Sequence, residues 1–501
     1  MLDLRRFRFK PYMLLPILPL LAVAIFCLRY HQDLFSYYLP NSLWNDEVIY
    51  FKTIEGIKEF GIPQGYFGYN ESHASVGTFG AWSPVIYLFD AMWGWMLGWY
   101  LYSPIIARVF FAIFCMGIYA ITCKPNIKSM IGISLFITGF SLYARYLVSQ
   151  MTDCYIVSLL LIFAGLYKKK NENSKYTIAI VVLAAILTLM RPYFVLLWFL
   201  IYSLKNEKKL LIIEPVVGLG SLLGYFVISK YFTAEYFTSL IKLDWIRLIV
   251  DSPSEGVNNF LNIINEAIND INAYIVKAIS LGDAVGAQYL LFYLLTIVFL
   301  FLCIYDSANR QEWITWAVIN IAFWFAIVLL YDLRVGSRHL MPFIIMEGVV
   351  LIGKNIRNLL DKMKVSLIVG ASCFLFMIKL TDPYLMTIPV YNVSLDAQIK
   401  EIREELAENI DIDRDNRWDN TVIWVFSDTD GSYPWQTLYA LPPGMGINIC
   451  TYDYVSMNFS KLNSRYIACT SGGDISSRCK ANGYEELLNM HDKNICIYRT
   501  R

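Results

Sequence analysis

Charged side chains are scarce in this sequence. Asp, Glu, Lys and Arg make up only 17% of the 501 residues, whereas 57% are hydrophobic and 16% are aromatic. A soluble globular domain carries about 25% charged residues, so this composition argues against a soluble protein. The net charge is only +1, so the sequence has no excess of basic residues that would indicate binding to nucleic acid. The apolar residues arrive in long blocks, which predicts a polytopic membrane protein.

Several motifs of catalysis and cofactor binding are also missing. The sequence has no Cys-x-x-Cys pair, no His/Cys spacing of a metal site, no P-loop and no Gly-x-Ser-x-Gly elbow. We therefore expect no nucleotide cofactor and no dedicated metal-ligand set, while a divalent cation held by acidic side chains stays open. Six of the ten cysteines lie in or beside apolar segments, where they read as small hydrophobic residues.

The hydrophobic blocks have the length of membrane spans. The first, "YMLLPILPLLAVAIFCL", follows the basic start "MLDLRRFRFK" and is not followed by a small-residue cleavage site. It therefore predicts an uncleaved first helix with its N-terminus in the cytoplasm. Further apolar segments lie at about 104–123, 129–148, 153–167, 176–190, 192–204, 210–229, 287–305, 313–331, 341–353 and 365–381.

Basic residues in short loops orient these spans, because cytoplasmic loops are enriched in Lys and Arg. Their clusters are at Lys124 and Lys128, Lys168 to Lys170 with Lys175, Lys205 to Lys209, and Lys354 to Lys364. For all of these clusters to be cytoplasmic, an even number of membrane crossings must separate each from the next. This condition is met if the aromatic segment 83–104 lies in the outer interface; a true span there is the alternative. The prediction is then about eleven transmembrane helices and an external C-terminus.

Three large regions are predicted to be external, at 30–103, 230–286 and 382–501. The last is predicted to be a small α/β domain that follows a transmembrane domain of residues 1–381. Within it, "NTVIWVFS", "RYIACT" and "NICIYR" indicate strands, and "YEELLNM" indicates a helix. Its cysteines, Cys450, Cys469, Cys479 and Cys496, could pair in an oxidising compartment.

An adjacent acid pair, Asp46 and Glu47, opens the first external region. It stands in the stretch "NSLWNDEVIYFKTI", between apolar residues rather than in a charged run. Desolvation raises the pKa of a carboxylate and makes it a better base, so this setting favours catalysis over a solvated surface. The aromatic loop that follows is about 50 residues long, a length that is usually functional when it is ordered.

Two further groups fall on the same predicted side of the membrane. Asp153 begins a span, where an acid is also favourable simply as a first-turn residue facing the helix dipole. Arg334, Arg338 and His339 occupy a short external loop, where basic residues are disfavoured and so need a reason. A lipid phosphate at the outer face is one reason, and a salt bridge from Asp332 is the alternative.

The order of these motifs resembles the GT-C glycosyltransferases, particularly the protein O-mannosyltransferase and lipid A aminoarabinose transferase types. The resemblance covers roughly residues 1–380 and is carried by short motifs: Asp46-Glu47 in "NDEVIYFK", Arg108 in "SPIIARVFFAIF", Asp153 in "MTDCYIV", Arg191-Pro192 in "LTLMRPYF", and "SRHLMPFI" with His339 in place of a Tyr. His73 departs from the family pattern, because Ala74 and Ser75 follow it where Pro-Pro is common.

The resemblance implies inverting transfer of a sugar from a polyprenyl-phosphate donor to an acceptor at the outer face of the membrane. Asp46, Glu47 and Asp153 are then the expected catalytic acids, Arg334, Arg338 and His339 the donor-phosphate residues, and His73 and Lys52 substrate-binding residues. The acceptor is a surface polysaccharide, a lipid-linked glycan or a protein. The alternatives are an O-antigen ligase or polymerase, a transporter, and a membrane scaffold without catalysis.

Overall fold

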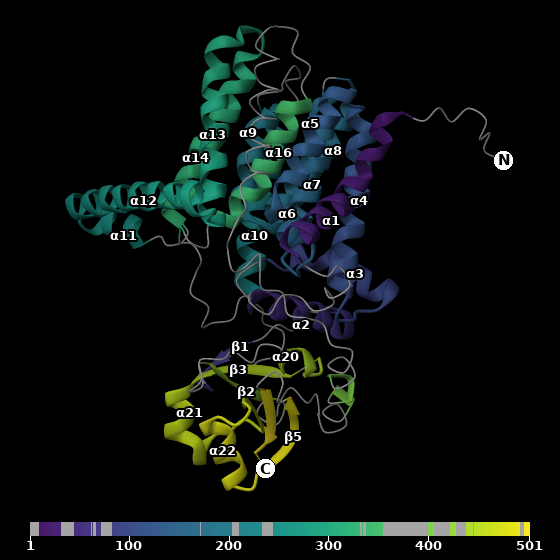
Figure 1. Ribbon diagram of the computed structural model, residues 1–501. Coiled ribbons are helices and arrows are strands. Elements are labelled where there is room, and N and C mark those ends of the chain that lie inside the picture. The colour runs from purple at the N-terminus through teal and green to yellow at the C-terminus, as the bar shows by residue number, and fades with distance from the viewer. Residues whose placement is uncertain are drawn as a thin grey trace, which may run out of the picture.

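A computed structural model shows a helical bundle joined to a small sheet domain (Figure 1). It describes residues 10–31, 45–61, 63, 67–71, 83–170, 172–202, 210–232, 244–330, 333, 337–353, 399–401, 403–404, 421–426, 437–443, 445–490 and 495–500.

The bundle is built from apolar helices that run from one end of the molecule toward the sheet domain (Figure 1). Its helices are α1 (Leu18–Tyr30, preceded by the 3-10 turn η2, Pro11–Ile17), α4 (Ser103–Cys123), α5 (Ile127–Gly139), α6 (Ser141–Leu147), α7 (Asp153–Lys168), α8 (Ser174–Met190), η5 (Pro192–Leu196) with α9 (Leu197–Tyr202), α10 (Leu210–Phe232), α13 (Ala284–Tyr305), η6 (Ser307–Asn309) with α14 (Arg310–Leu330), and η7 (Ser337–His339) with α16 (Leu340–Gly353).

These helices match the predicted apolar segments. In the part of the chain that the structure describes, five helices are long and apolar enough to cross a membrane, or six if α5 and α6 form one bent span. The three apolar stretches Ser174–Met190, Pro192–Tyr202 and Leu340–Gly353 are shorter. The predicted segment 365–381 lies outside the described residues, so the total of about eleven spans stays a prediction.

The aromatic segment 83–104 holds a short helix rather than a span. A 3-10 turn, η4 (Pro84–Tyr87), leads into α3 (Leu88–Leu97), whose ten residues are about 15 Å long, half of a bilayer core. Gly98 ends the helix with a φ of 85°, a left-handed conformation that glycine adopts without strain. The chain then turns into α4. A helix this short is not long enough for the alternative of a span, and its place at the outer interface stays a prediction.

The predicted external region 230–286 contains a helical corner. The short α11 (Asp244–Asp251) packs on α12 (Pro253–Leu281), and α12 projects sideways from the bundle (Figure 1). Gly282, with a φ of 70°, ends α12, and the Asp283 side chain accepts a hydrogen bond from the Gly286 amide to begin α13. A left-handed cap followed at once by an N-cap explains this abrupt change of direction.

The C-terminal domain is built around a six-stranded mixed sheet. Its strands are β1 (Phe67–Tyr69), β2 (Thr421–Phe426), β3 (Gly446–Thr451), β4 (Tyr466–Thr470), β5 (Glu485–Met490) and β6 (Ile495–Arg499), in the order β1-β3-β2-β4-β6-β5. The short helices α20 (Thr437–Ala440), α21 (Tyr452–Asn458, followed by the 3-10 turn η8, Phe459–Lys461) and α22 (Asp474–Ala481) connect them.

The edge strand β1 comes from the first of the regions predicted to be external, and it pairs in parallel with β3. The sheet therefore takes one strand from outside residues 382–501, and the first loop and the C-terminal domain share a hydrogen-bonded ladder. Apart from this strand, the predicted domain boundary between residues 381 and 382 stays a prediction.

The predicted strands β2, β4 and β6 are confirmed, and one helix prediction is wrong. The stretch "YEELLNM" contains β5, which pairs antiparallel with β6 through a bulge between Glu486 and Leu488. Gly483, with a φ of 70°, separates it from α22. Glu and Leu favour helix locally, but pairing with β6 satisfies the backbone and overrides that preference.

The four cysteines of this domain lie together in its second hydrophobic core. All four are free thiols in the structure, and the Sγ atoms of Cys469 and Cys496 are 3.4 Å apart across the β4–β6 pair. Disulfide pairing among them stays a prediction.

Candidate functional site

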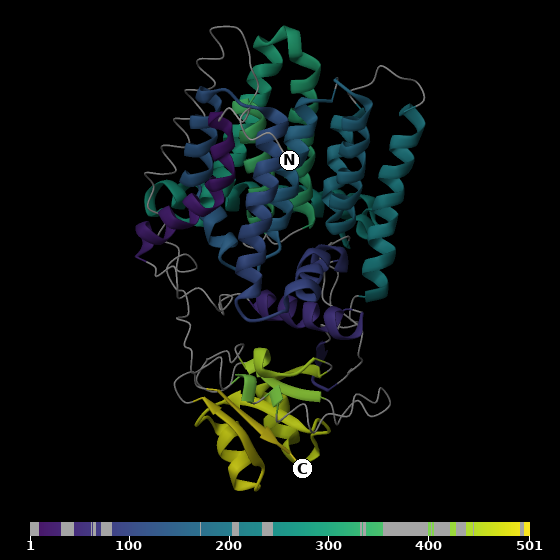
Figure 2. The same cartoon turned by 90° about the vertical axis from the view of Figure 1, so that its right-hand side faces the viewer.

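The acid pair lies at the start of α2 (Asn45–Phe60), a helix between the bundle and the sheet domain (Figures 1 and 2). The Glu47 side chain is fully buried, and its Oε1 accepts a hydrogen bond of 2.8 Å from the Gln150 backbone amide. The Gln150 side-chain amide can in turn donate to the Glu47 carbonyl and accept from the Phe51 amide. The start of α2 is therefore tied to the segment that precedes α7.

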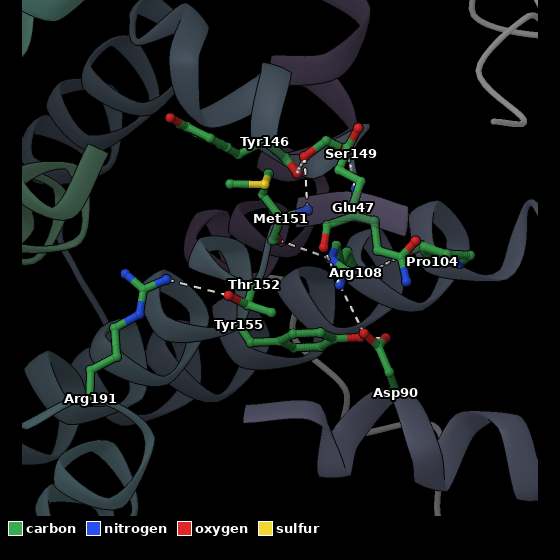
Figure 3. A network of polar contacts seen from close by, with 11 residues as sticks. Glu47, Asp90, Pro104, Arg108, Tyr146, Ser149, Met151, Thr152, Tyr155 and Arg191 are labelled. Atoms are coloured by element: carbon green, nitrogen blue, oxygen red, sulfur yellow. Dashed lines mark hydrogen bonds and ion pairs between the residues drawn. The ribbon is translucent and has the colours of Figure 1, made fainter. Parts of the chain in front are cut away.

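That segment, residues 148–152, is an irregular break between α6 and α7. Arg108 of α4 stabilises the break, donating to the carbonyls of Gln150 at 2.9 Å and Met151 at 3.1 Å (Figure 3). Its guanidinium also donates to the Pro104 carbonyl at 3.0 Å. Buried carbonyls outside regular structure need such donors, and a guanidinium supplies several at once.

Arg108 is balanced by an acid that the sequence did not mark as a site residue. Its Nη2 pairs with Asp90 of α3 at 2.8 Å, and both side chains are fully buried. The Tyr155 hydroxyl donates to the other carboxylate oxygen of Asp90. Burial raises the pKa of Asp90, while Arg108 and Tyr155 oppose that rise. The helix α3 therefore supports the Arg108 side of the site.

A second buried ion pair lies on the other side of the break. Asp153, the first residue of α7, accepts a hydrogen bond of 2.8 Å from Arg191 Nη1. The same nitrogen donates to the Tyr193 hydroxyl at 2.9 Å, and Nη2 donates to the Thr152 hydroxyl at 3.3 Å (Figure 3). The Arg191-Pro192 sequence explains this position, because α8 ends at Met190 and the extended Arg191 turns its side chain into the core.

His339 joins this second cluster. Its Nδ1 lies 2.7 Å from Arg191 Nη1 and 3.3 Å from the Tyr193 hydroxyl. Since Arg191 only donates, Nδ1 is an acceptor and the imidazole is neutral. Burial and the neighbouring charges of Arg191 and Arg338 hold the pKa of His339 well below its ordinary value, in agreement with this tautomer. Arg338 is half-buried and also acts electrostatically on Tyr146 and Tyr193.

The structure thus brings together four of the predicted site residues: Glu47, Asp153, Arg338 and His339. Lys52 lies elsewhere. It is buried on α2, pairs with Glu55, and donates to the Leu441 carbonyl of the C-terminal domain. Arg334, His73 and the Asp46 side chain lie outside the described residues.

The described acids do not form a cation site. Glu47 faces a backbone N–H, while Asp90 and Asp153 are each paired with an arginine. No group of three or more His, Cys, Asp and Glu side chains suited to a metal ion occurs among the residues that the structure describes.

Sequence reasoning missed Asp90 and the whole 148–152 break as parts of the site. A signal was present: "SQMTD" is a polar run inside an otherwise apolar stretch from residue 129 to 167. Polar residues at such a place need partners, and Arg108 and Arg191 are those partners.

Comparison with known proteins gives structural likenesses only. No protein-family model matches the chain, and no curated protein sequence matches it. The crystal structure of ArnT from Cupriavidus metallidurans bound to undecaprenyl phosphate is similar, with 9% identity, a TM-score of 0.50 and 97% of each chain covered. An Archaeoglobus fulgidus oligosaccharyltransferase, crystallised with Zn and sulfate, shows 12% identity and a TM-score of 0.47 over 90% of this chain and 68% of its own.

The likeness to ArnT confirms the predicted fold class. The chain is a polytopic α-helical membrane protein with a GT-C-like fold, similar to that of ArnT, and a small C-terminal sheet domain. At 9% identity the likeness concerns the fold, and the site must be argued from this chain's own residues.

Proposed function

We propose that this protein is a glycosyltransferase that moves a sugar from a polyprenyl-phosphate donor to an acceptor at the outer face of the membrane. The observation that carries the proposal is the convergence of Glu47 and Asp153 on one five-residue break. Glu47 binds the Gln150 amide, and Asp153 follows three residues later in an ion pair with Arg191. Two acids from distant parts of the sequence thus lie along one short break that Arg108 and Arg191 also contact.

The chemistry needs a base at the acceptor and cations at the leaving group. As the acceptor oxygen attacks the anomeric carbon, its proton passes to a carboxylate, for which we propose Asp46. The bond between the anomeric carbon and the phosphate oxygen breaks on the opposite face, which inverts the configuration. Glu47 is fully buried and already bonded to a backbone amide, so it serves better as a positioning acid.

The departing polyprenyl phosphate gains negative charge, which Arg338 and Arg334 are proposed to stabilise. Arg338 is half-buried and lies beside neutral His339, and it is the least buried of the described arginines of this cluster. Arg191, by contrast, is fully buried and engaged by Asp153 and Tyr193. It holds the site together rather than binding the donor.

The distribution of charge supports the proposed orientation. The helix α2 and the C-terminal domain lie at one end of the bundle (Figure 1). Asp153 begins α7, and Lys168 ends it, so the lysines lie at the end of α7 that is far from the acids. If those lysines are cytoplasmic, the acceptor is a glycan, lipid or protein outside the plasma or inner membrane.

The decisive experiment is transfer from a polyprenyl-phosphate sugar by the purified protein in nanodiscs. We expect Asp46→Asn to lower kcat by roughly 10²- to 10⁴-fold, because it removes the basic lone pair but keeps the size of the side chain. Glu47→Gln should lower kcat less, since Gln keeps an acceptor for the Gln150 amide.

The matched control is Glu59→Gln on the same helix, where the acid is exposed and paired only with Lys58 among the described residues. It should transfer at the wild-type rate. Wild-type rates in Asp46→Asn as well would remove the acid pair from catalysis, and no transfer by the wild type with any such donor would reject the function.

A further inference from the structure

The helix that carries the acid pair is held by the C-terminal domain through buried charges. Lys52 and Glu55, on one face of α2, form an ion pair, and their side chains are only 4% and 5% exposed. Arg403, from the chain before β2, forms a second ion pair with Glu55. Lys52 also donates to the Leu441 carbonyl, just after α20. Three charged side chains thus join segments that are about 350 residues apart.

The same contact continues toward Glu47. Arg403 Nε donates to the Tyr439 carbonyl of α20 at 2.9 Å, and the Tyr439 ring packs edge-on against Phe51 of α2 with 5.1 Å between centroids. Tyr439 is fully buried and close enough to Glu47 to interact with it electrostatically. A continuous chain of contacts therefore runs from the ion pairs to the acid.

A second connection lies farther along the first loop. Glu71 accepts hydrogen bonds from the backbone amides of Asn463 and Ser464, at 3.1 and 2.7 Å. Together with the pairing of β1 and β3, this attaches the loop to the sheet independently of Lys52, Glu55 and Arg403. The two connections can therefore be separated by mutation.

Burying the charges of Lys52 and Glu55, with Arg403 partly buried beside them, costs free energy. Apolar residues of similar size would make a packing contact at a lower cost in free energy. What a buried ion pair supplies instead is a single geometry, because any shift leaves a charge without its partner. Lys52 and Glu55 lie about one to two helical turns after Glu47. Their ion pairs therefore fix the rotation of α2 about its axis and its position along that axis.

We infer that the C-terminal domain is part of the active site, and that Lys52, Glu55 and Arg403 are positioning residues that place α2 and its acids against the 148–152 break. The inference rests on the proposed function for its catalytic consequence. It assigns the domain a role in the chemistry besides any contact with the acceptor. It also explains why Lys52, predicted to bind substrate, faces the domain.

The test is Glu55→Gln, which keeps the volume of the side chain but leaves Lys52 and Arg403 facing a neutral amide. A small displacement of a catalytic group lowers the reaction rate by a large factor. We therefore expect kcat to fall roughly 10- to 100-fold while KM for the donor stays within about 2-fold. Glu59→Gln is the matched control on the same helix. Arg403→Lys keeps a cation for Glu55 and should retain more activity than Arg403→Met.

Hydrogen exchange gives a readout that does not require activity. In Glu55→Gln, the amides of residues 47–51 should exchange faster, while those of β1 and β3 stay protected through the Glu71 connection. Unchanged exchange of α2 together with a wild-type kcat would overturn the inference. Unprotected β1 would overturn it too, since the domain would then have simply unfolded. If the wild type transfers no sugar, faster exchange in α2 alone still shows the positioning, and the proposed function fails separately.

Discussion

The charge of a single lysine shows how the burial of α2 affects stability. Burial lowers the pKa of Lys52 to about 8, with Arg403 acting in the same direction and Glu55 opposing it. The folded-state pKa is therefore below the ordinary value of 10.5. Between these two values the unfolded chain binds more protons than the folded protein, so this group adds stability as the pH rises.

We accordingly expect the apparent Tm of the wild type to rise, relative to Lys52→Met, between pH 8 and pH 10.5. The shift of about 2.5 units corresponds to roughly 3 kcal/mol, all of it gained within that window. Thermal melting of both proteins in the same detergent from pH 7 to pH 10.5 measures the difference. A gap between the two curves that is constant with pH would show that folding does not lower the pKa of Lys52.

Glycine determines the helical corner between α12 and α13. A Cβ at Gly286 would lie 1.8 Å from the Tyr274 carbonyl oxygen, which belongs to the backbone and cannot rotate away. Gly220 on α10 has no atom within 4 Å of the corresponding position. The first glycine is therefore required by a close approach of two helices, and the second is not.

Gly286→Ala should lower the free energy of unfolding by roughly 1–3 kcal/mol or more, because α12 must move off α13. Gly220→Ala should be neutral or slightly stabilising, since Ala favours helix over Gly by about 1 kcal/mol. Thermal melting of the two variants side by side decides the matter. Equal melting temperatures would show that α12 and α13 can move apart at this corner without a loss of stability.

Helices formed by long apolar segments were predictable from the sequence. Strands that depend on hydrogen bonding to a distant partner strand were not. The helices Ser103–Cys123 and Ala284–Tyr305 agree with the predicted segments 104–123 and 287–305, because long apolar runs have few alternatives in a membrane. The stretch that became β5 gave a helical signal, and only its partner β6 made it a strand. The strand β1 has three residues and could not be predicted without its partner β3.

The candidate site was predictable in part for a similar reason. Glu47, Asp153 and His339 stood out because charged or polar groups at helix ends need an explanation. Asp90 and Gln150 act through contacts that arise only when α2, α3 and α7 meet, and no local pattern encodes those contacts.

At the scale of the whole molecule, the distribution of charge predicts a definite orientation. Lys168 ends α7, and Lys169 and Lys170 follow it, at the opposite end of this helix from Asp153. Lys168 donates to the carbonyls of Cys123 and Gly353, which end α4 and α16, so this end of the bundle is well defined. Basic residues at one end predict that it faces the cytoplasm and that the sheet domain lies outside.

Cysteine labelling in intact cells tests this orientation. Ser174 is exposed at the start of α8, near those lysines, and Met457 is 82% exposed on α21 of the sheet domain. A membrane-impermeant maleimide should label Met457→Cys from outside and should label Ser174→Cys only after the membrane is opened, because a charged reagent does not cross the bilayer. The parent protein gives the background, which should be low since eight of the nine free cysteines in the described residues are buried and only Cys303 is partly exposed. Labelling of Ser174→Cys in intact cells, with Met457→Cys protected, would reverse the topology and place the acid pair on the cytoplasmic face, where a polyprenyl-phosphate donor would have to present its sugar inward.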